Sequence, residues 1–60
     1  MNTQNKLNKI IESGFTQLDI ASKTSISQPT ISRIASGVHV DIKASTASAI
    51  SDLYERVVAA

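Results

Sequence analysis

Apolar residues recur at helical spacing near the start of the chain. They are Leu7, Ile10 and Ile11, which lie three and four positions apart. This spacing is that of one face of an α-helix. Asn2 or Thr3 is a suitable N-cap, and Gly14 tolerates the left-handed conformation that follows a helix end. We therefore predict a first helix that ends at Ser13 and Gly14.

A second helix is predicted to begin after Thr16. The Thr16 hydroxyl can accept an N–H without an intrahelical partner, and Asp19 lies where a negative charge favours the helix dipole. The helix is predicted to end near Lys23, because residues 24–27 alternate β-branched residues with serines that compete for backbone hydrogen bonds. Its predicted inward residues are Leu18, Ile20 and Ala21. Residues 24–27 are predicted to form a tight turn.

A third short helix is predicted between Ser27 and Gly37. Ser27 is its expected N-cap, and Pro29 falls in its first turn, where a missing N–H costs nothing. Ile31 and Ile34 are three positions apart and are expected to face the core. The side chains left facing outward are Gln28, Pro29, Thr30, Ser32 and Arg33.

A last helix is predicted from about Ala44, with Asp41 or Ser45 as its cap. Before it, residues 38–42 alternate apolar and polar, which favours a loop over a short extended segment. The apolar positions of the last helix are Ala47, Ile50, Leu53, Tyr54, Val57 and Val58. Tyr54, Val57 and Val58 are expected to serve either the core or a dimer contact. The predicted fold is all-α, a compact bundle of four to five helices.

Composition narrows the class of protein. A chain of 60 residues makes a single domain, residues 1–60, and buries only about 60% of its unfolded surface. It has no cysteine, which excludes disulfides and cysteine zinc sites, and no apolar run near the roughly 20 residues of a membrane span. We expect a soluble cytoplasmic protein without cofactor, metal or small-molecule ligand. The formal net charge is only +1, so any DNA binding must depend on where charges lie.

Two short helices joined by a turn of three or four residues form the helix-turn-helix pattern. In such units the second helix lies in the major groove of DNA, and its N-terminal residues meet the base edges. Gln28 is suited to the N6 and N7 edge of adenine, and Arg33 to O6 and N7 of guanine. The Pro29 ring or the Thr30 methyl group is suited to a thymine methyl.

The window from Gly14 to Gly37 resembles the lambda-repressor-like family of phage Cro and CI repressors, also called the XRE family. The resemblance rests on Thr16-Gln17 at the start of the second helix, the small Ala21, the apolar anchors Ile31 and Ile34, and Gly37. It implies a lambda-repressor-like fold with a central helix-turn-helix. It also implies a sequence-specific transcriptional regulator that binds double-stranded operator DNA as a homodimer, at least on the DNA.

The resemblance assigns contact roles position by position. The predicted base-contacting residues are Gln28, Pro29, Thr30, Ser32 and Arg33. The predicted phosphate-contacting residues are Gln17, Ser27, Ser36, Val38, His39 and Lys43. Gln17 is also expected to support Gln28 against its base. His39 is the only histidine and is assigned to no metal.

The sequence departs from the family at three places. Ser25 stands where the turn usually has glycine, and a left-handed non-glycine residue costs on the order of 1 kcal/mol. Thr24 replaces a usual core residue. Many members join the first helix to the end of the third by an Arg–Glu pair, whereas this chain has Ile10 and Ala35. An apolar replacement of a buried ion pair is often neutral, so this indicates a different core.

The function predicted from the resemblance is that of a small Cro-like repressor, with two copies on half-sites about 34 Å apart. An antitoxin or a restriction-modification controller protein of the same fold is an alternative. A helical protein-interaction module that does not bind DNA is another. No nucleophile elbow, paired carboxylates or phosphate-binding glycine loop is present, which argues against an enzyme.

Overall fold

The computed structural model describes residues 2–38 and 41–59, and within these ranges its regular secondary structure is all α-helix. The helices are α1 (Thr3–Glu12), α2 (Gln17–Thr24), α3 (Gln28–Ser36) and α4 (Ala44–Val57). The all-α fold is confirmed, with the lower of the two helix numbers that the sequence predicted. Val38, Asp41 and Ile42 form neither helix nor strand, as expected for a loop. None of the four helices has the length and apolar character needed to cross a membrane.

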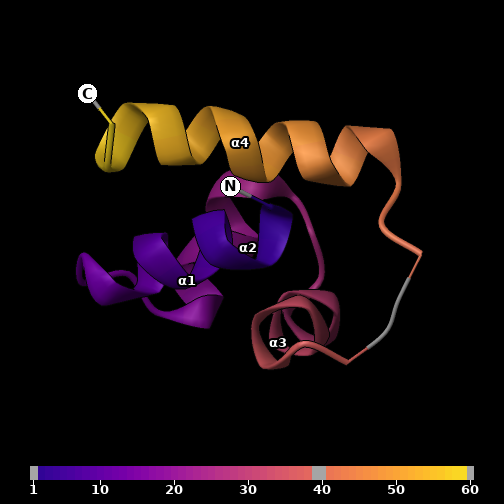
Figure 1. Cartoon of the computed structure of the whole chain (residues 1–60). Helices are drawn as coiled ribbons and strands as arrows, with labels where there is room; N and C mark the ends of the chain where they lie inside the picture. Colours follow the sequence, from indigo (N-terminus) through magenta and orange to yellow (C-terminus); the bar gives the residue numbers. More distant parts are fainter. Residues whose placement is uncertain (1, 39–40, 60) are drawn as a thin grey trace.

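Helices α1 and α2 form the middle of the molecule. Both pack against α3 and against α4. Figure 1 shows α4 along one side of this pair and α3 at the opposite side. One long side of α3 therefore faces away from the rest of the protein.

The core consists almost entirely of isoleucine and leucine. Its buried members are Leu7, Ile10, Ile20, Ile31, Ile34, Ile50 and Leu53. Tyr54, Val57 and Val58 are partly buried and pack against this cluster, so the structure places them with the core. The prediction that Leu18 faces inward is wrong, since 64% of it is exposed. In a helix, Leu18 and Ile20 are two residues apart and point to different sides, so burial of Ile20 excludes Leu18.

Local capping chemistry places the starts of α1 and α2 where the sequence predicts them. Asn2 caps α1, and its side-chain oxygen accepts the N–H of Asn5 at 2.8 Å. Thr16 caps α2 by accepting the N–H of Asp19 at 3.0 Å, and the Asp19 carboxylate accepts the N–H of Thr16 in return. This reciprocal pair is a capping box.

The caps of α3 and α4 differ from the predictions. Ser27 occupies the N-cap position of α3, but its hydroxyl bonds to the Thr30 hydroxyl at 2.8 Å and not to the backbone. For α4, the expected caps Asp41 and Ser45 are wrong, because the N-cap residue is Lys43, which makes no side-chain cap. The start of α4 is thus not set by a side-chain cap.

Two of the three departures from the family pattern, Thr24 and Ser25, lie at the end of α2 and at the start of the turn that follows it. Ser25 adopts the left-handed conformation, with φ of 61° and ψ of 21°. Thr24 is half-buried, and its hydroxyl donates to the carbonyl of Ile20 at 2.7 Å and accepts the N–H of Ile26 at 3.3 Å. Hydrogen bonds to the backbone therefore satisfy the Thr24 hydroxyl, which stands where the family usually has an apolar side chain.

Replacing Ser25 with glycine is expected to raise the free energy of unfolding by up to about 1 kcal/mol, because glycine adopts this conformation without the steric penalty of a Cβ. The added entropy of glycine in the unfolded chain offsets part of this gain. Urea denaturation measures the change, with Ser22→Gly in the exposed middle of α2 as the control. The control should destabilise, and destabilisation by Ser25→Gly as well would contradict the argument.

Candidate nucleic-acid interface

Helices α2 and α3 form a helix-turn-helix unit with a short connection, Ser25 to Ser27. Ile20 from α2 is fully buried, as is Ile31 from α3, and Ala21 packs against the same cluster. These inward contacts hold α3 by one side only. The opposite side of α3 is free for contact with another molecule.

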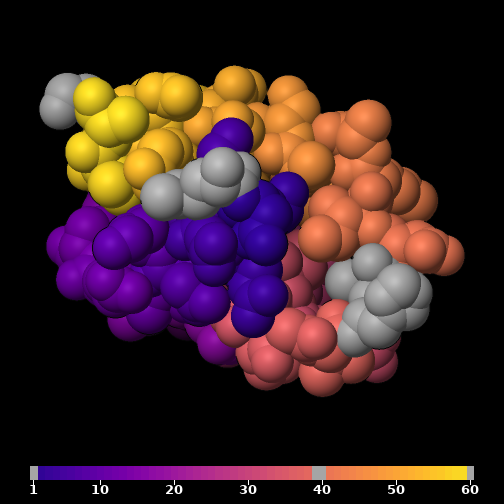
Figure 2. All heavy atoms as spheres, viewed as in Figure 1, coloured from indigo at the N-terminus to yellow at the C-terminus, as the bar shows by residue number. Residues whose placement is uncertain are grey.

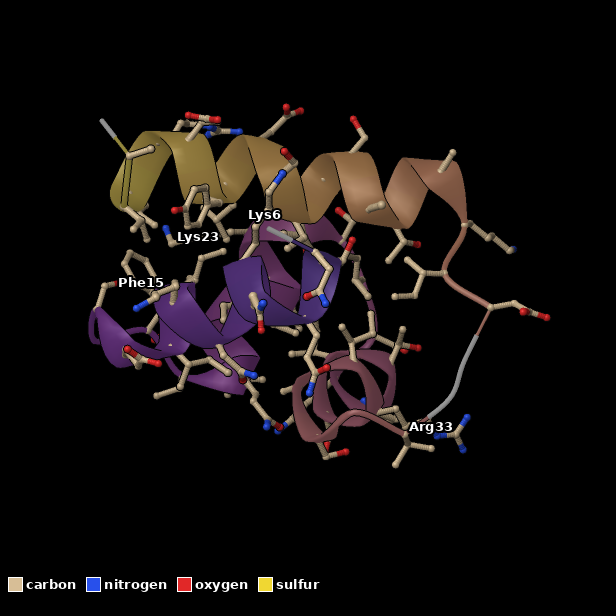
Figure 3. The ribbon with its side chains drawn as sticks, in the orientation of Figure 1. Lys6, Phe15, Lys23 and Arg33 are labelled. Atoms are coloured by element: carbon tan, nitrogen blue, oxygen red, sulfur yellow. The ribbon has the colours of Figure 1, made fainter. Side chains whose placement is uncertain are left out.

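The exposed side of α3 carries most of the side chains that the sequence assigned to the bases. They are Gln28, Pro29, Ser32 and Arg33, and the neighbouring Ser36 is exposed as well. Figure 3 shows Arg33 directed away from the protein. In Figure 2, atoms of α3 lie at the edge of the molecule opposite α4. Exposed side chains, most of them polar, therefore lie along the helix that a helix-turn-helix protein inserts into DNA.

Thr30 has a different environment from the other predicted base-contacting residues. It is half-buried, and its hydroxyl is bonded to that of Ser27. Both residues line a hollow of about 380 Å³ between the turn, α3 and the start of α4. The hollow is also lined by Arg33, Asp41 and Lys43, so it brings two cations together beside α3.

The remaining lysines in the helices are engaged elsewhere. Lys6 donates to the Ser51 hydroxyl at 2.9 Å and so connects α1 with α4. Lys9 lies 3.8 Å from the carboxylate of Glu12. The Lys23 ammonium lies 5.9 Å from the centre of the Phe15 ring, as Figure 3 shows. Arg33 and Lys43 are thus the cations on the side of the hollow.

The N-terminus of α2 offers backbone donors. The first N–H groups of a helix have no partner within it, and the capping box engages only that of Asp19. The N–H groups of Gln17 and Leu18 are therefore the ones directed out of the helix end. The N–H and hydroxyl of Thr16, and then the nearby Lys23 ammonium, lower the pKa of Asp19. Its negative charge completes the cap at neutral pH.

Comparison with known protein families decides the class of this unit. The model of a helix-turn-helix family, of the XRE type, matches residues 6–57. The chain belongs to this family. It is therefore a DNA-binding transcription regulator, in a family that is generally not enzymatic. No curated protein and no solved structure gives a significant match.

Several of the DNA contacts that the sequence assigned to this XRE-type helix-turn-helix protein stay predictions. Within the described residues, no hydrogen bond joins Gln17 to Gln28, so the support of Gln28 is untested. Gln17 itself is half-buried. Val38 is exposed, but its N–H donates to the carbonyl of Arg33 at 3.1 Å. His39 lies outside the described residues.

Two residues of α1 that contact α3 in this helix-turn-helix protein were not predicted from the sequence. Gln4 and Asn8 of α1 both donate side-chain hydrogen bonds to the carbonyl of Ala35. Their one signal in the sequence is their spacing of four residues, which places two amides on the same side of α1. That spacing does not reveal the partner, which is 27 to 31 residues away.

Proposed function

We propose that residues 1–60 act as one DNA-binding domain of a Cro-like repressor, which reads an operator by placing α3 in the major groove. The observation that carries this proposal is the exposed row of side chains on α3, which includes the cation Arg33 and has Lys43 across the hollow beside it. Gln28 and Arg33 would contact base edges. Lys43 and the N-terminus of α2 would contact phosphates on either side.

Two copies would bind a pseudo-palindromic operator as a homodimer. A single copy offers the short helix α3, with Arg33 on it and Lys43 beside it, which is a small footprint for specific binding. Two-fold symmetric pairing doubles these contacts, and half-sites then lie about 34 Å apart on one face of the duplex. Occupancy of the operator would exclude other proteins from the same DNA, which represses an overlapping promoter.

Selection from a random duplex library at low salt, followed by sequencing, tests this proposal. We expect enrichment of a two-fold symmetric site whose half-sites are separated by about one helical turn, 10 to 10.5 base pairs. A reporter promoter that overlaps the selected site should then be repressed by the wild-type protein. Lack of any enriched sequence, or activation of the reporter, would contradict the proposal.

A further inference from the structure

The last turn of α3 has its carbonyl groups satisfied from two sources. The N–H of Val38 donates to the carbonyl of Arg33 at 3.1 Å, and that of Gly37 donates to the carbonyl of Ile34 at 3.2 Å. The last carbonyls of a helix have no partner within it. The carbonyl of Ala35 finds its partners in another helix, since it accepts from Gln4 Nε2 at 3.4 Å and from Asn8 Nδ2 at 3.3 Å.

Gln4 and Asn8 thus form an amide clamp on the C-terminal turn of α3. Both residues are half-buried and lie one helical turn apart on α1. Gln4 also approaches the backbone closely beyond α3, because a Cβ at Gly37 would lie 2.8 Å from its Nε2. The clamp therefore contacts the recognition helix at the carbonyl of Ala35 and at Gly37, both near its C-terminal end.

Directional contacts between α1 and α3 are otherwise scarce. The residues that the two helices bury are all apolar: Leu7 and Ile10 in α1, and Ile31 and Ile34 in α3. Apolar burial is favourable but has no preferred direction. Hydrogen bonds weaken steeply when their geometry changes, so the two amides resist sliding and rotation of the end of α3.

We propose that Gln4 and Asn8 are positioning residues for sequence recognition, and that they set where Arg33 meets its base pair. This inference rests on the proposed function, in which Arg33 reads a base. Arg33 lies two residues before the clamped carbonyl. Gln28 lies seven residues before it, which is about 10 Å along the axis at 1.5 Å per residue. The clamp should therefore act mainly on the base pair of Arg33 and little on that of Gln28.

The test compares base preferences of the wild-type protein, the Gln4→Ala/Asn8→Ala double variant and a control, Asn5→Ala. Asn5 is an exposed amide of the same helix. Thermal unfolding is measured first, and selection is performed at a temperature at which each variant is folded. A bidentate base contact discriminates roughly 5- to 160-fold, and we expect the double variant to reduce the preference at the Arg33 base pair about fivefold. Preference at the Gln28 base pair should change less than about twofold, as in the control.

The comparison between two base pairs separates positioning from stability. A purely structural role would weaken binding to all sites alike and leave both preferences unchanged, which would overturn the inference. Equal loss of preference at both base pairs would also overturn it. Failure of the wild-type protein to enrich any site would instead contradict the proposed function.

A second variant keeps the test decisive if the double variant is too unstable. Asn8→Asp preserves the size of the side chain but replaces the donor with an acceptor facing the carbonyl of Ala35. Its added negative charge weakens binding to every sequence in the same proportion, so the ratio of preferences is unaffected. We expect the same selective loss at the Arg33 base pair, and an unchanged preference there would again overturn the inference.

Discussion

Replacing Arg33 with alanine is expected to weaken binding to the selected operator by about 1–3 kcal/mol and to relax the preference at one base pair. Arg33 is exposed, points away from the protein and lies at the edge of a hollow that also contains Lys43. Its guanidinium carries a rigid fork of donors, which matches two acceptors on guanine. Loss of that fork removes both binding energy and discrimination, whereas binding to unrelated DNA should change much less.

Two control variants separate base reading from general attraction to DNA. Arg56→Ala removes the same charge from an exposed position on α4, on the side away from α3, and should have little effect. Arg33→Lys keeps the charge but loses the fork, so it should retain affinity for unrelated DNA and lose discrimination. Fluorescence anisotropy titrations with each of the four base pairs at the position in question measure both quantities. Similar losses for Arg33→Ala and Arg56→Ala would show that only charge matters.

Local chemistry explains why most of the helices could be predicted from the sequence. The capping box of Thr16 and Asp19 is formed by residues three positions apart, so the start of α2 is determined locally. Gly37 ends α3 for a similar reason, since its φ of 81° is easily adopted by glycine. The spacing of Ile31 and Ile34 then predicts which side of α3 is buried. The family-based prediction of the helix-turn-helix follows from these short-range features.

Predictions failed where tertiary contacts decide. Leu18 is apolar, but burial of Ile20 turns it outward, and an apolar residue can remain exposed without instability. The start of α4 is not marked by a capping side chain, since Lys43 takes the N-cap position although it has no oxygen in its side chain. The partner of Lys6 is Ser51, which lies 45 residues away and carries no signal in the sequence.

The proposed DNA-binding surface could likewise be predicted only in part from the sequence. Sequence predicts which residue types suit base edges, and the structure shows that Gln28, Pro29, Ser32 and Arg33 are exposed on one helix. The sequence does not predict that the Thr30 hydroxyl bonds to the Ser27 hydroxyl, because either hydroxyl could equally face solvent. Contacts between distant helices, such as that of Asn8 with Ala35, are visible only in three dimensions.

The largest effect on stability is expected from Leu7→Ala, which should lower the free energy of unfolding by about 2–5 kcal/mol. Leu7 is fully buried in α1, so its truncation removes apolar contacts and leaves a cavity. A domain of 60 residues has a total stability of only about 3–9 kcal/mol. Toward the lower end of this range the loss equals or exceeds the whole stability, and a large part of the variant would then be unfolded. Urea denaturation monitored by circular dichroism measures the change.

Leu18→Ala is the matched control, since it is the same substitution in a helix at a side chain that is 64% exposed. We expect a change within about 0.5 kcal/mol, as for other surface positions. A loss comparable to that of Leu7→Ala would contradict the arrangement of α2, because it would mean that Leu18 is buried. Leu18→Ala thus tests which side of α2 faces the core, and Leu7→Ala gives the loss expected for a buried leucine.

Operator DNA should restore the fold of Leu7→Ala, which distinguishes a loss of stability from a loss of recognition. Leu7 lies in the core and makes no part of the exposed side of α3, so the folded fraction of the variant should bind with wild-type affinity. Operator at 1,000 times its Kd stabilises the folded state by about 4 kcal/mol, which offsets most of the loss. Arg33→Ala should show the opposite behaviour, with full helicity in the absence of DNA and weak binding at every operator concentration. Failure of excess operator to restore helicity in Leu7→Ala would show that Leu7 also determines the binding surface, through the position of α3 against α1.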